Sequence, residues 1–167
     1  MGDPPSSPLL RQLPPASRLV LRGGPQVLAA TADALKLPHD ESPCRAVRNG
    51  DRAALWLGPD ERLLISPADE HPEIEGLLQG ALAGMPHSLV AISHAQVAFE
   101  LSGAHAALAL NIGCPLDLDA AAFPVDMCTR TVFAKAQIVL WRQGPETFRV
   151  ETGRSFAPYV TKILALA

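Results

Sequence analysis

Alternation of apolar and polar residues predicts several short strands along the chain. The clearest is Gln96–Leu101, in which Val97, Phe99 and Leu101 take every second position. A period of two is typical of a strand that buries one face. The same kind of pattern predicts six further strands, over Arg18–Arg22, Ala53–Leu57, Arg62–Ser66, Thr129–Phe133, Gln137–Arg142 and Thr147–Glu151.

A longer apolar period predicts the helices. The best stripe lies in residues 72–83, where Gly84 supplies a C-terminal cap; its apolar positions are Ile74, Leu77, Leu78, Ala81 and Leu82. Spacings of three and four residues place such positions on one helix face. Three more helices are predicted: one from Pro25, one from the Ser102-Gly103-Ala104 turn to Ile112, and one from about Ser155, with Pro158 in its first turn.

Two segments read almost alike: LWLGPDERLLI, from Leu55, and LWRQGPETFRV, from Leu140. Trp56 and Trp141 are 85 positions apart, whereas Gly58 and Gly144 are 86 apart, which suggests one extra residue in the second turn. We interpret the two segments as equivalent hairpins, with Trp56 and Trp141 as anchors of sheet packing or of a subunit contact. The chain is therefore predicted to be α+β, with two pseudo-repeated β-α-β-β-α units, antiparallel sheets and helices on one face.

The predicted organisation has three parts. Residues 1–16 contain five prolines and are expected to form a flexible arm. The first α+β unit is expected over residues 17–87 and the second over residues 88–167, and the two can pack as one compact domain.

Composition excludes several classes of function. The 14 Lys and Arg against 17 Asp and Glu leave a net charge of −3, and aromatic residues make up 5% of the chain, which argues against nucleic-acid binding. No apolar run is long enough to cross a membrane, and the N-terminal residues carry no hydrophobic signal core. The three cysteines have no CxxC spacing, so we expect a protein of the reducing cytoplasm.

Residues that often carry chemistry are present without forming a set. Gly23-Gly24 lies between a strand and a helix, where amides can hold phosphate, but it matches neither GxGxxG nor a P-loop, and turn geometry explains it and Ser102-Gly103 equally well. Asp117 and Asp119 indicate an exposed turn before a helix. No metal-ligand spacing relates the remaining candidates, which are His39, His71, His87, His94, His105, Cys44, Cys114 and Cys128.

Cys114 and Cys128 are expected to be buried, inert thiols, because each has apolar neighbours and no visible base. The sequence itself thus predicts no catalytic, cofactor-binding or metal-binding residue. One hypothesis of another kind stays open, a transferase that uses Cys114 or Asp117.

Four longer motifs point to a family. ISHAQVAFELSG starts at Ile92, NIGCPLDL at Asn111, FPVDMCTRT at Phe123 and GRSFAPYV at Gly153. In this order and spacing they resemble the gamma subunit family of bacterial heterotetrameric sarcosine oxidase, over about residues 13–164. GCPLDL, MCTRT and RSFAPYV are the most specific of these motifs.

The resemblance implies a role in a complex. It implies the aminomethyltransferase-like, folate-binding fold and a non-catalytic subunit that assembles with alpha, beta and delta subunits. Such a complex oxidises sarcosine to glycine, passes the one-carbon unit to tetrahydrofolate and produces hydrogen peroxide. FAD, FMN, NAD, zinc and tetrahydrofolate are then expected in the partner subunits, and no cofactor in this chain. The fold implied by the resemblance also leaves open a free-standing folate or pterin binder with a pocket between the two units.

Two positions depart from the family pattern. The resemblance leads us to expect glycine in place of Asp126 and an aromatic residue in place of Gly153. An aspartate can occupy a left-handed turn at some cost, and the loss of a large aromatic side chain removes packing area. Both departures bear on the partner surface more than on the fold, and leave room for a paralogue that serves a related methylated amine.

Overall fold

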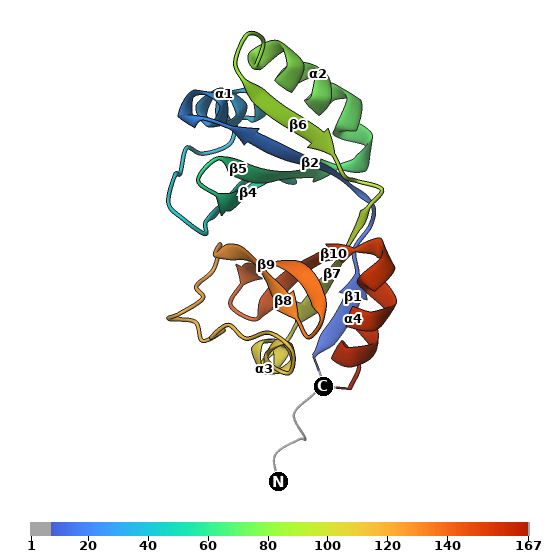
Figure 1. The fold of residues 1–167 in the computed structure, drawn as a ribbon. Coiled ribbons are helices and arrows are strands. Elements are labelled where there is room, and N and C mark those ends of the chain that lie inside the picture. Colours follow the sequence, from blue (N-terminus) through green and yellow to red (C-terminus); the bar gives the residue numbers. More distant parts are fainter. Residues whose placement is uncertain (1–7, 167) are drawn as a thin grey trace. The chain divides into compact units, whose positions relative to one another are not determined.

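The computed structural model describes residues 8–166, and these form two compact units. The first, here called the central unit, is Pro15–Ser93. The second, the terminal unit, combines residues 8–14 with residues 94–166 and so contains both ends of the described chain. Each unit has its own antiparallel sheet (Figure 1). None of the helices within residues 8–166 is long and apolar enough to span a membrane.

The central unit places two helices on one face of a five-stranded sheet (Figure 1). The strand order is β3-β4-β5-β2-β6, and every pairing is antiparallel. The strands are β2 (Ala16–Gly23), β3 (Ala46–Asn49), β4 (Arg52–Gly58), β5 (Glu61–Pro67) and β6 (His87–Ala91). The helices are α1 (Pro25–Leu35) and α2 (His71–Ala81), with a 3-10 turn, η1 (Ala68–Glu70), before α2.

The core of the central unit follows from the sequence periods. Leu19 and Leu21 occupy alternate positions of β2 and meet the helices. From α2 and its C-cap, Ile74, Leu78 and Leu82 contribute the stripe predicted at spacings of four. The buried members of this cluster are Leu19, Leu21, Val27, Leu35, Leu37, Ala54, Leu64, Ile74, Leu78 and Leu82.

The terminal unit has the strand order β1-β7-β10-β9-β8, again fully antiparallel. Its strands are β1 (Leu9–Gln12), β7 (Gln96–Ser102), β8 (Cys128–Phe133), β9 (Ala136–Gly144) and β10 (Thr147–Gly153). Its helices are α3 (Ala106–Asn111) and α4 (Ala157–Leu164), the second preceded by the 3-10 turn η2 (Arg154–Phe156). The α+β class with antiparallel sheets and helices is therefore confirmed, and Pro158 does fall in the first turn of α4.

The Pro-rich N-terminal segment differs from the prediction. Of the expected arm, residues 1–7 lie outside the described residues, but Leu9–Gln12 form strand β1 along β7. Leu10 packs against the core of the terminal unit, and Arg11 forms a 3.0 Å ion pair with Glu100 on the opposing strand. The prediction of a flexible arm over residues 8–16 was wrong. The many prolines of this segment suggested a chain without regular structure, but a short strand forms between Pro8 and Pro14.

The predicted boundary between the units was also wrong. We expected it after residue 87, but β6 pairs with β2 and extends the central unit to Ser93. The strands β3 and β6 were both missed, because each is short and mostly exposed and shows no clear alternation. The helix expected after Asp119 does not form; this segment is a series of turns.

Strand β1 allows a test with two neighbouring leucines. Leu10→Asp places a charge against the core of the terminal unit and should lower the free energy of unfolding by about 2 kcal/mol. Leu9→Asp is the matched control, because Leu9 lies on the other face of the same strand and is 64% exposed. Chemical denaturation followed by circular dichroism compares them; equal stability of the two variants would contradict the strand assignment.

Candidate functional site

The two Gly-Pro hairpins have the same length. In β4–β5, Trp56 pairs with Arg62 and Gly58 with Glu61, so that Leu57 is bulged. In β9–β10, Arg142 pairs with Phe148 and Gly144 with Thr147, so that Gln143 is bulged. No extra residue is present in the second turn. The prediction of an insertion near Arg142 was wrong, because β4 and β9 each carry one bulged residue at the same position before the turn.

It follows that the two tryptophans are not equivalent. Arg142 takes the place of Trp56 in the second hairpin, and Trp141 lies one residue earlier. Since a shift of one residue turns a side chain to the other face of the sheet, Trp141 points away from the helices and is 3% exposed. Trp56 lies on the helix-facing side with Ala54 and is partly exposed.

The helix-facing positions hold the same kind of pair in both hairpins. The guanidinium of Arg62 lies 5.9 Å from the centre of the Trp56 ring, and that of Arg142 lies 5.0 Å from the centre of the Phe148 ring. The cation comes from the second strand in one hairpin and from the first strand in the other. Both units therefore use a cross-strand cation–π pair, with the two partners exchanged.

The glycines between strand and helix, Gly23 and Gly103, donate hydrogen bonds to the turns of these hairpins. The amide of Gly23 donates to the carbonyl of Asp60 at 3.0 Å, and the amide of Gly103 donates to the carbonyl of Glu146 at 2.9 Å. A side chain at Gly23 would lie 2.5 Å from Val27, whereas Gly103 has a φ of +118°. These amides hold the Gly-Pro turns, so the turn interpretation accounts for both glycines and phosphate binding has no support here.

Arg142 donates several hydrogen bonds in the interior of the terminal unit. It is 6% exposed, and its guanidinium donates to the carbonyls of Phe123 at 2.8 Å, Leu118 at 3.2 Å and Pro145 at 3.2 Å, with a longer contact to Gly144 at 3.4 Å. The first two carbonyls belong to the long loop between α3 and β8. Arg142 thus fastens this loop to the β9–β10 turn.

The loop that Arg142 holds contains the GCPLDL motif. Asn111, at the end of α3, donates from its side-chain amide to the carbonyls of Cys114 at 3.2 Å and Leu116 at 2.7 Å. Phe123 is 1% exposed, and its ring centre lies 6.5 Å from that of Phe148. Within the motif Cys114 and Leu118 are buried in the core of the terminal unit, whereas Pro115 and Asp117 are exposed. The motif therefore contributes to packing, and no sequence pattern indicated that Arg142 anchors it.

The acidic and thiol candidates in this loop do not form a catalytic group. Asp117 accepts a hydrogen bond from the amide of Asp119 at 2.9 Å, and Asp119 accepts one from the amide of Ala121 at 2.8 Å. Such bonds are typical of aspartates that shape turns. Cys114 is 3% exposed and Cys128 is fully buried, as predicted, so neither thiol can be reached by a substrate. A transferase that uses Cys114 or Asp117 has no support.

The five histidines lie apart, each in a local setting. His71 is the only one that faces a hydroxyl at close range among the described contacts: its Nδ1 lies 2.7 Å from Ser17 Oγ, and its Nε2 lies 4.0 Å from Glu75. Ser17 is 3% exposed, so this contact fastens the start of α2 to β2. The others are placed as follows: His39 contacts Asp33 at 2.8 Å, His87 contacts the Met85 carbonyl at 2.8 Å, His94 is exposed in a turn, and His105 precedes α3.

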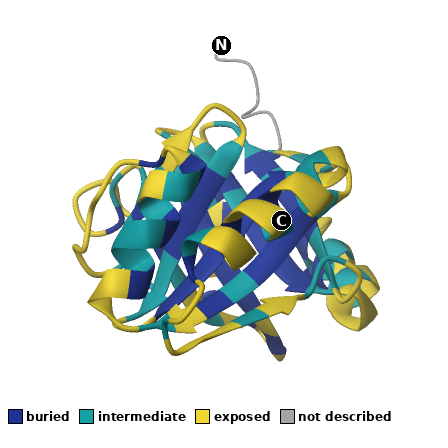
Figure 2. Ribbon diagram, turned by 90° about the horizontal axis from the view of Figure 1, so that it is seen from above, coloured by how far each residue is buried: buried dark blue, intermediate teal, exposed yellow. Residues whose placement is uncertain are grey.

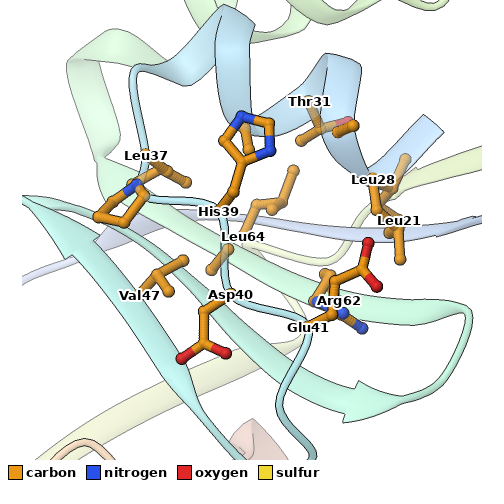
Figure 3. Close-up of a pocket in the computed structure, with 14 residues that line it drawn as sticks. Leu21, Leu28, Thr31, Leu37, His39, Asp40, Glu41, Val47, Arg62 and Leu64 are labelled. Atoms are coloured by element: carbon orange, nitrogen blue, oxygen red, sulfur yellow. The ribbon is translucent and has the colours of Figure 1, made fainter. Parts of the chain in front are cut away.

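The described residues contain no group of three or more His, Cys, Asp or Glu that could hold a metal ion. They do contain a small pocket in the central unit, between α1, the 37–41 loop and the sheet (Figure 3). Its walls are apolar, and its rim carries Arg62, His39, Asp40 and Glu41. A hydrogen bond from the Ser42 side chain, and a second from its backbone amide, lower the pKa of Asp40.

The size of this pocket limits what it can hold. Its volume is about 50 Å³, which is enough for a few water molecules when one water needs roughly 10–15 Å³ on the same measure. A pterin ring does not fit such a space. We therefore interpret the pocket as a gap in the packing beside the Arg62–Trp56 pair.

Filling this gap should stabilise the central unit. Ala54→Val adds two methyl groups on strand β4, where Ala54 is 8% exposed and lines the pocket. We expect a gain of about 0.5–1 kcal/mol in the free energy of unfolding, since cavity filling and β propensity act together. Thermal melting compares it with Ala53→Val on the opposite face, which should not stabilise; a destabilised Ala54→Val variant would show that the gap cannot accept the side chain.

The two departures from the family pattern have different meanings. Asp126 has a φ of +64°, so it does occupy the left-handed turn where glycine was expected, and its amide donates to the Arg142 carbonyl at 2.8 Å. Cys44, at the start of the corresponding strand of the central unit, has a φ of +58°. Gly153 has a φ of −59°, which any residue adopts, so its backbone does not require glycine.

Known proteins are similar in sequence to this chain along most of its length. The model of the sarcosine oxidase, gamma subunit family matches residues 23–167. A sarcosine oxidase subunit gamma from an Arthrobacter species is 35% identical over 153 residues, covering 89% of this chain and 74% of the relative. The subunit gamma from Corynebacterium sp. (strain U-96) is 38% identical over 107 residues, 64% of this chain but only 51% of the relative, so the match spans about half of that protein's length.

Solved structures agree with the sequence comparison. A chain of the heterotetrameric sarcosine oxidase from Corynebacterium sp. U-96, in complex with pyrrole 2-carboxylate, matches with a TM-score of 0.87 and 31% identity, over 94% of this chain and 81% of that chain. The glycine cleavage system aminomethyltransferase T from Bartonella henselae matches with a TM-score of 0.70 and 15% identity, over 93% of this chain and 44% of that chain, which shows a shared fold. The predicted family resemblance is thus confirmed: the chain belongs to the sarcosine oxidase gamma subunit family.

Proposed function

We propose that this chain is the gamma subunit of a heterotetrameric oxidase that converts sarcosine to glycine and delivers the one-carbon unit to tetrahydrofolate. The observation that carries the proposal is the match of nearly the whole chain to a chain of such a heterotetramer. The partners would be the alpha, beta and delta subunits. FAD, FMN, NAD, zinc and tetrahydrofolate would be held by those partners.

The role proposed for the chain itself is structural. In support of this, the motifs that identify the family are used for packing: GCPLDL is held by Arg142 and Asn111, and the Gly-Pro turns are held by Gly23 and Gly103. These hydrogen bonds to backbone carbonyls fix the shape of the loop and of the turns, which suits a structural role.

We also infer that the two units are copies of one ancestral unit. In each unit a strand and a helix are followed by three strands and a second helix, one strand more than the predicted β-α-β-β-α pattern. Their strand orders correspond, with β6 beside β2 in one sheet and β1 beside β7 in the other. The amide of Ile92, directly after β6, donates to the carbonyl of Arg18 in β2, and the amide of Leu13, directly after β1, donates to the carbonyl of Ala98 in β7. The paired bulges and the paired glycine-to-turn hydrogen bonds support the same inference.

The experiment for the proposed function is co-purification. A tagged form of this chain, co-expressed with the cognate alpha, beta and delta subunits, should carry all three partners in equal amounts and show flavin absorbance. Native mass spectrometry reads the stoichiometry. Recovery of the chain alone, while the other subunits accumulate as folded flavoproteins, would contradict the proposal.

A free-standing folate or pterin binder is the rival hypothesis, and the shared fold with an aminomethyltransferase is its motive. The pocket of the central unit is too small for a pterin. Calorimetric titration of the isolated chain with a reduced folate should show no saturable heat at sub-millimolar ligand. Saturable binding in that range would favour the rival.

A further inference from the structure

Helix α3 differs from the other three helices on its outward side. Leu108, on α3, and Ile112, its C-cap residue, are four positions apart and exposed, Leu108 by 68% and Ile112 by 58%. On the inward side Ala106, Ala109 and Leu110 are buried. The helix is thus apolar on both sides, which is typical of helices covered from both sides.

The other helices provide an internal comparison. The exposed faces of α1, α2 and α4 carry charged side chains, among them Asp33, Glu73 and Lys162. Residues 104–112 contain no Asp, Glu, Lys or Arg. Scattered apolar residues are normal on a surface, but two large ones together on a short helix without any charge indicate a contact surface.

The charged residues near this surface are mostly acidic. Lys135 lies close to the end of α3, because the amide of the preceding Ala134 donates to the Gly113 carbonyl at 2.8 Å, whereas the loop after α3 contributes Asp117 and Asp119. From Leu101 to Thr129 the chain contains no Lys or Arg, but it contains Asp117, Asp119 and Asp126. Asp117 and Asp119 are exposed and lie in the loop that Asn111 ties to the end of α3 through the Leu116 carbonyl. An apolar centre with acidic neighbours is complementary to an apolar patch bordered by Lys or Arg.

We propose that the surface formed by Leu108 and Ile112, which we call the α3 surface, is a docking site for another subunit of the oxidase, on an apolar patch of that subunit bordered by Lys or Arg. This rests on the proposed function, which supplies the partner subunits. A like copy of this chain fits less well, because it would bring the same acidic loop against itself. Figure 2 shows several exposed stretches, but the exposed helix positions of α1, α2 and α4 are interrupted by charge.

The test uses the co-expressed complex. Leu108→Glu and Ile112→Glu, as separate variants, should each weaken recovery of the partner subunits at least about tenfold, because a carboxylate is then buried against an apolar patch. Leu77→Glu on α2, which is 41% exposed, is the matched control and should assemble like the wild type. Thermal melting of each isolated chain should be unchanged, since all three side chains are exposed.

The acidic part of the surface has its own variant. Asp117→Asn and Asp119→Asn together keep a side-chain oxygen for the turn hydrogen bonds and remove both charges. This variant should associate about two- to tenfold more weakly at low salt and lose part of the salt dependence. Unchanged association and salt dependence would overturn the charge complementarity.

The remaining outcomes separate this proposal from the proposed function. If the wild type assembles and both glutamate variants assemble equally well, the α3 surface is not a docking site, while the proposed function stands. If the isolated wild type forms dimers that Leu108→Glu converts to monomers in light scattering, a second copy is the occupant and the proposal is wrong. If the wild type itself fails to assemble with the other subunits, the proposed function falls and this proposal falls with it.

Discussion

Arg142→Met should lower the free energy of unfolding by about 3–5 kcal/mol. Methionine retains an apolar stem of similar length but removes every donor from the buried carbonyls of Leu118 and Phe123 and from Pro145. Each buried carbonyl left without a donor costs about 1–3 kcal/mol. The loop with the GCPLDL motif should then detach from the β9–β10 turn.

Two further variants make this prediction specific. Arg142→Lys should recover only part of the loss, because an ammonium group cannot reach both the loop and the turn as the planar guanidinium does. Arg154→Met is the matched control, because Arg154 is exposed in η2. Urea denaturation followed by circular dichroism measures all three variants. A loss below about 1 kcal/mol for Arg142→Met would show that water satisfies the loop carbonyls.

Gly23→Ala is expected to destabilise the central unit by about 1–3 kcal/mol. The added carbon would lie 2.5–2.9 Å from three side-chain carbons of Val27, so α1 must move away from β2. The neighbouring Gly24→Ala has no atom within 4 Å of the added carbon and a φ of −71°, and should change stability by no more than about 0.5 kcal/mol.

This adjacent pair also separates two interpretations of Gly23-Gly24. If the glycines close-pack helix and strand, thermal melting will distinguish the two variants strongly. If they instead held an anion, both variants would melt like the wild type, and only phosphate binding would change. Equal melting temperatures for the two variants would therefore contradict the structural role assigned to Gly23.

The sequence predicts the elements with long patterns well and those with short patterns poorly. Strand Gln96–Leu101 has three periodic apolar positions and the helix near residues 72–83 has five, and both form close to where they were expected. Strands β1, β3 and β6 have four or five residues each and were not predicted. In such strands the pairing with a neighbouring strand determines the structure, and the local sequence pattern carries no information on that pairing.

The role of Arg142 could not be predicted from its neighbourhood in the sequence. Its main acceptors, Leu118 and Phe123, are 24 and 19 residues away and are backbone carbonyls, which carry no sequence signal. The mistaken pairing of Trp56 with Trp141 has a similar origin. Identical residue types suggested the alignment, whereas the ladder hydrogen bonds set it one residue differently.

Omission of this chain from the complex tests the central claim most directly. The alpha, beta and delta subunits would be co-expressed with and without it, and the mass, flavin content and sarcosine-dependent peroxide production of the product would be measured. Our account predicts that, without this chain, the alpha, beta and delta subunits no longer associate into one complex and the flavin content of the product falls. A stable complex of these three subunits with full flavin content and activity would contradict the account.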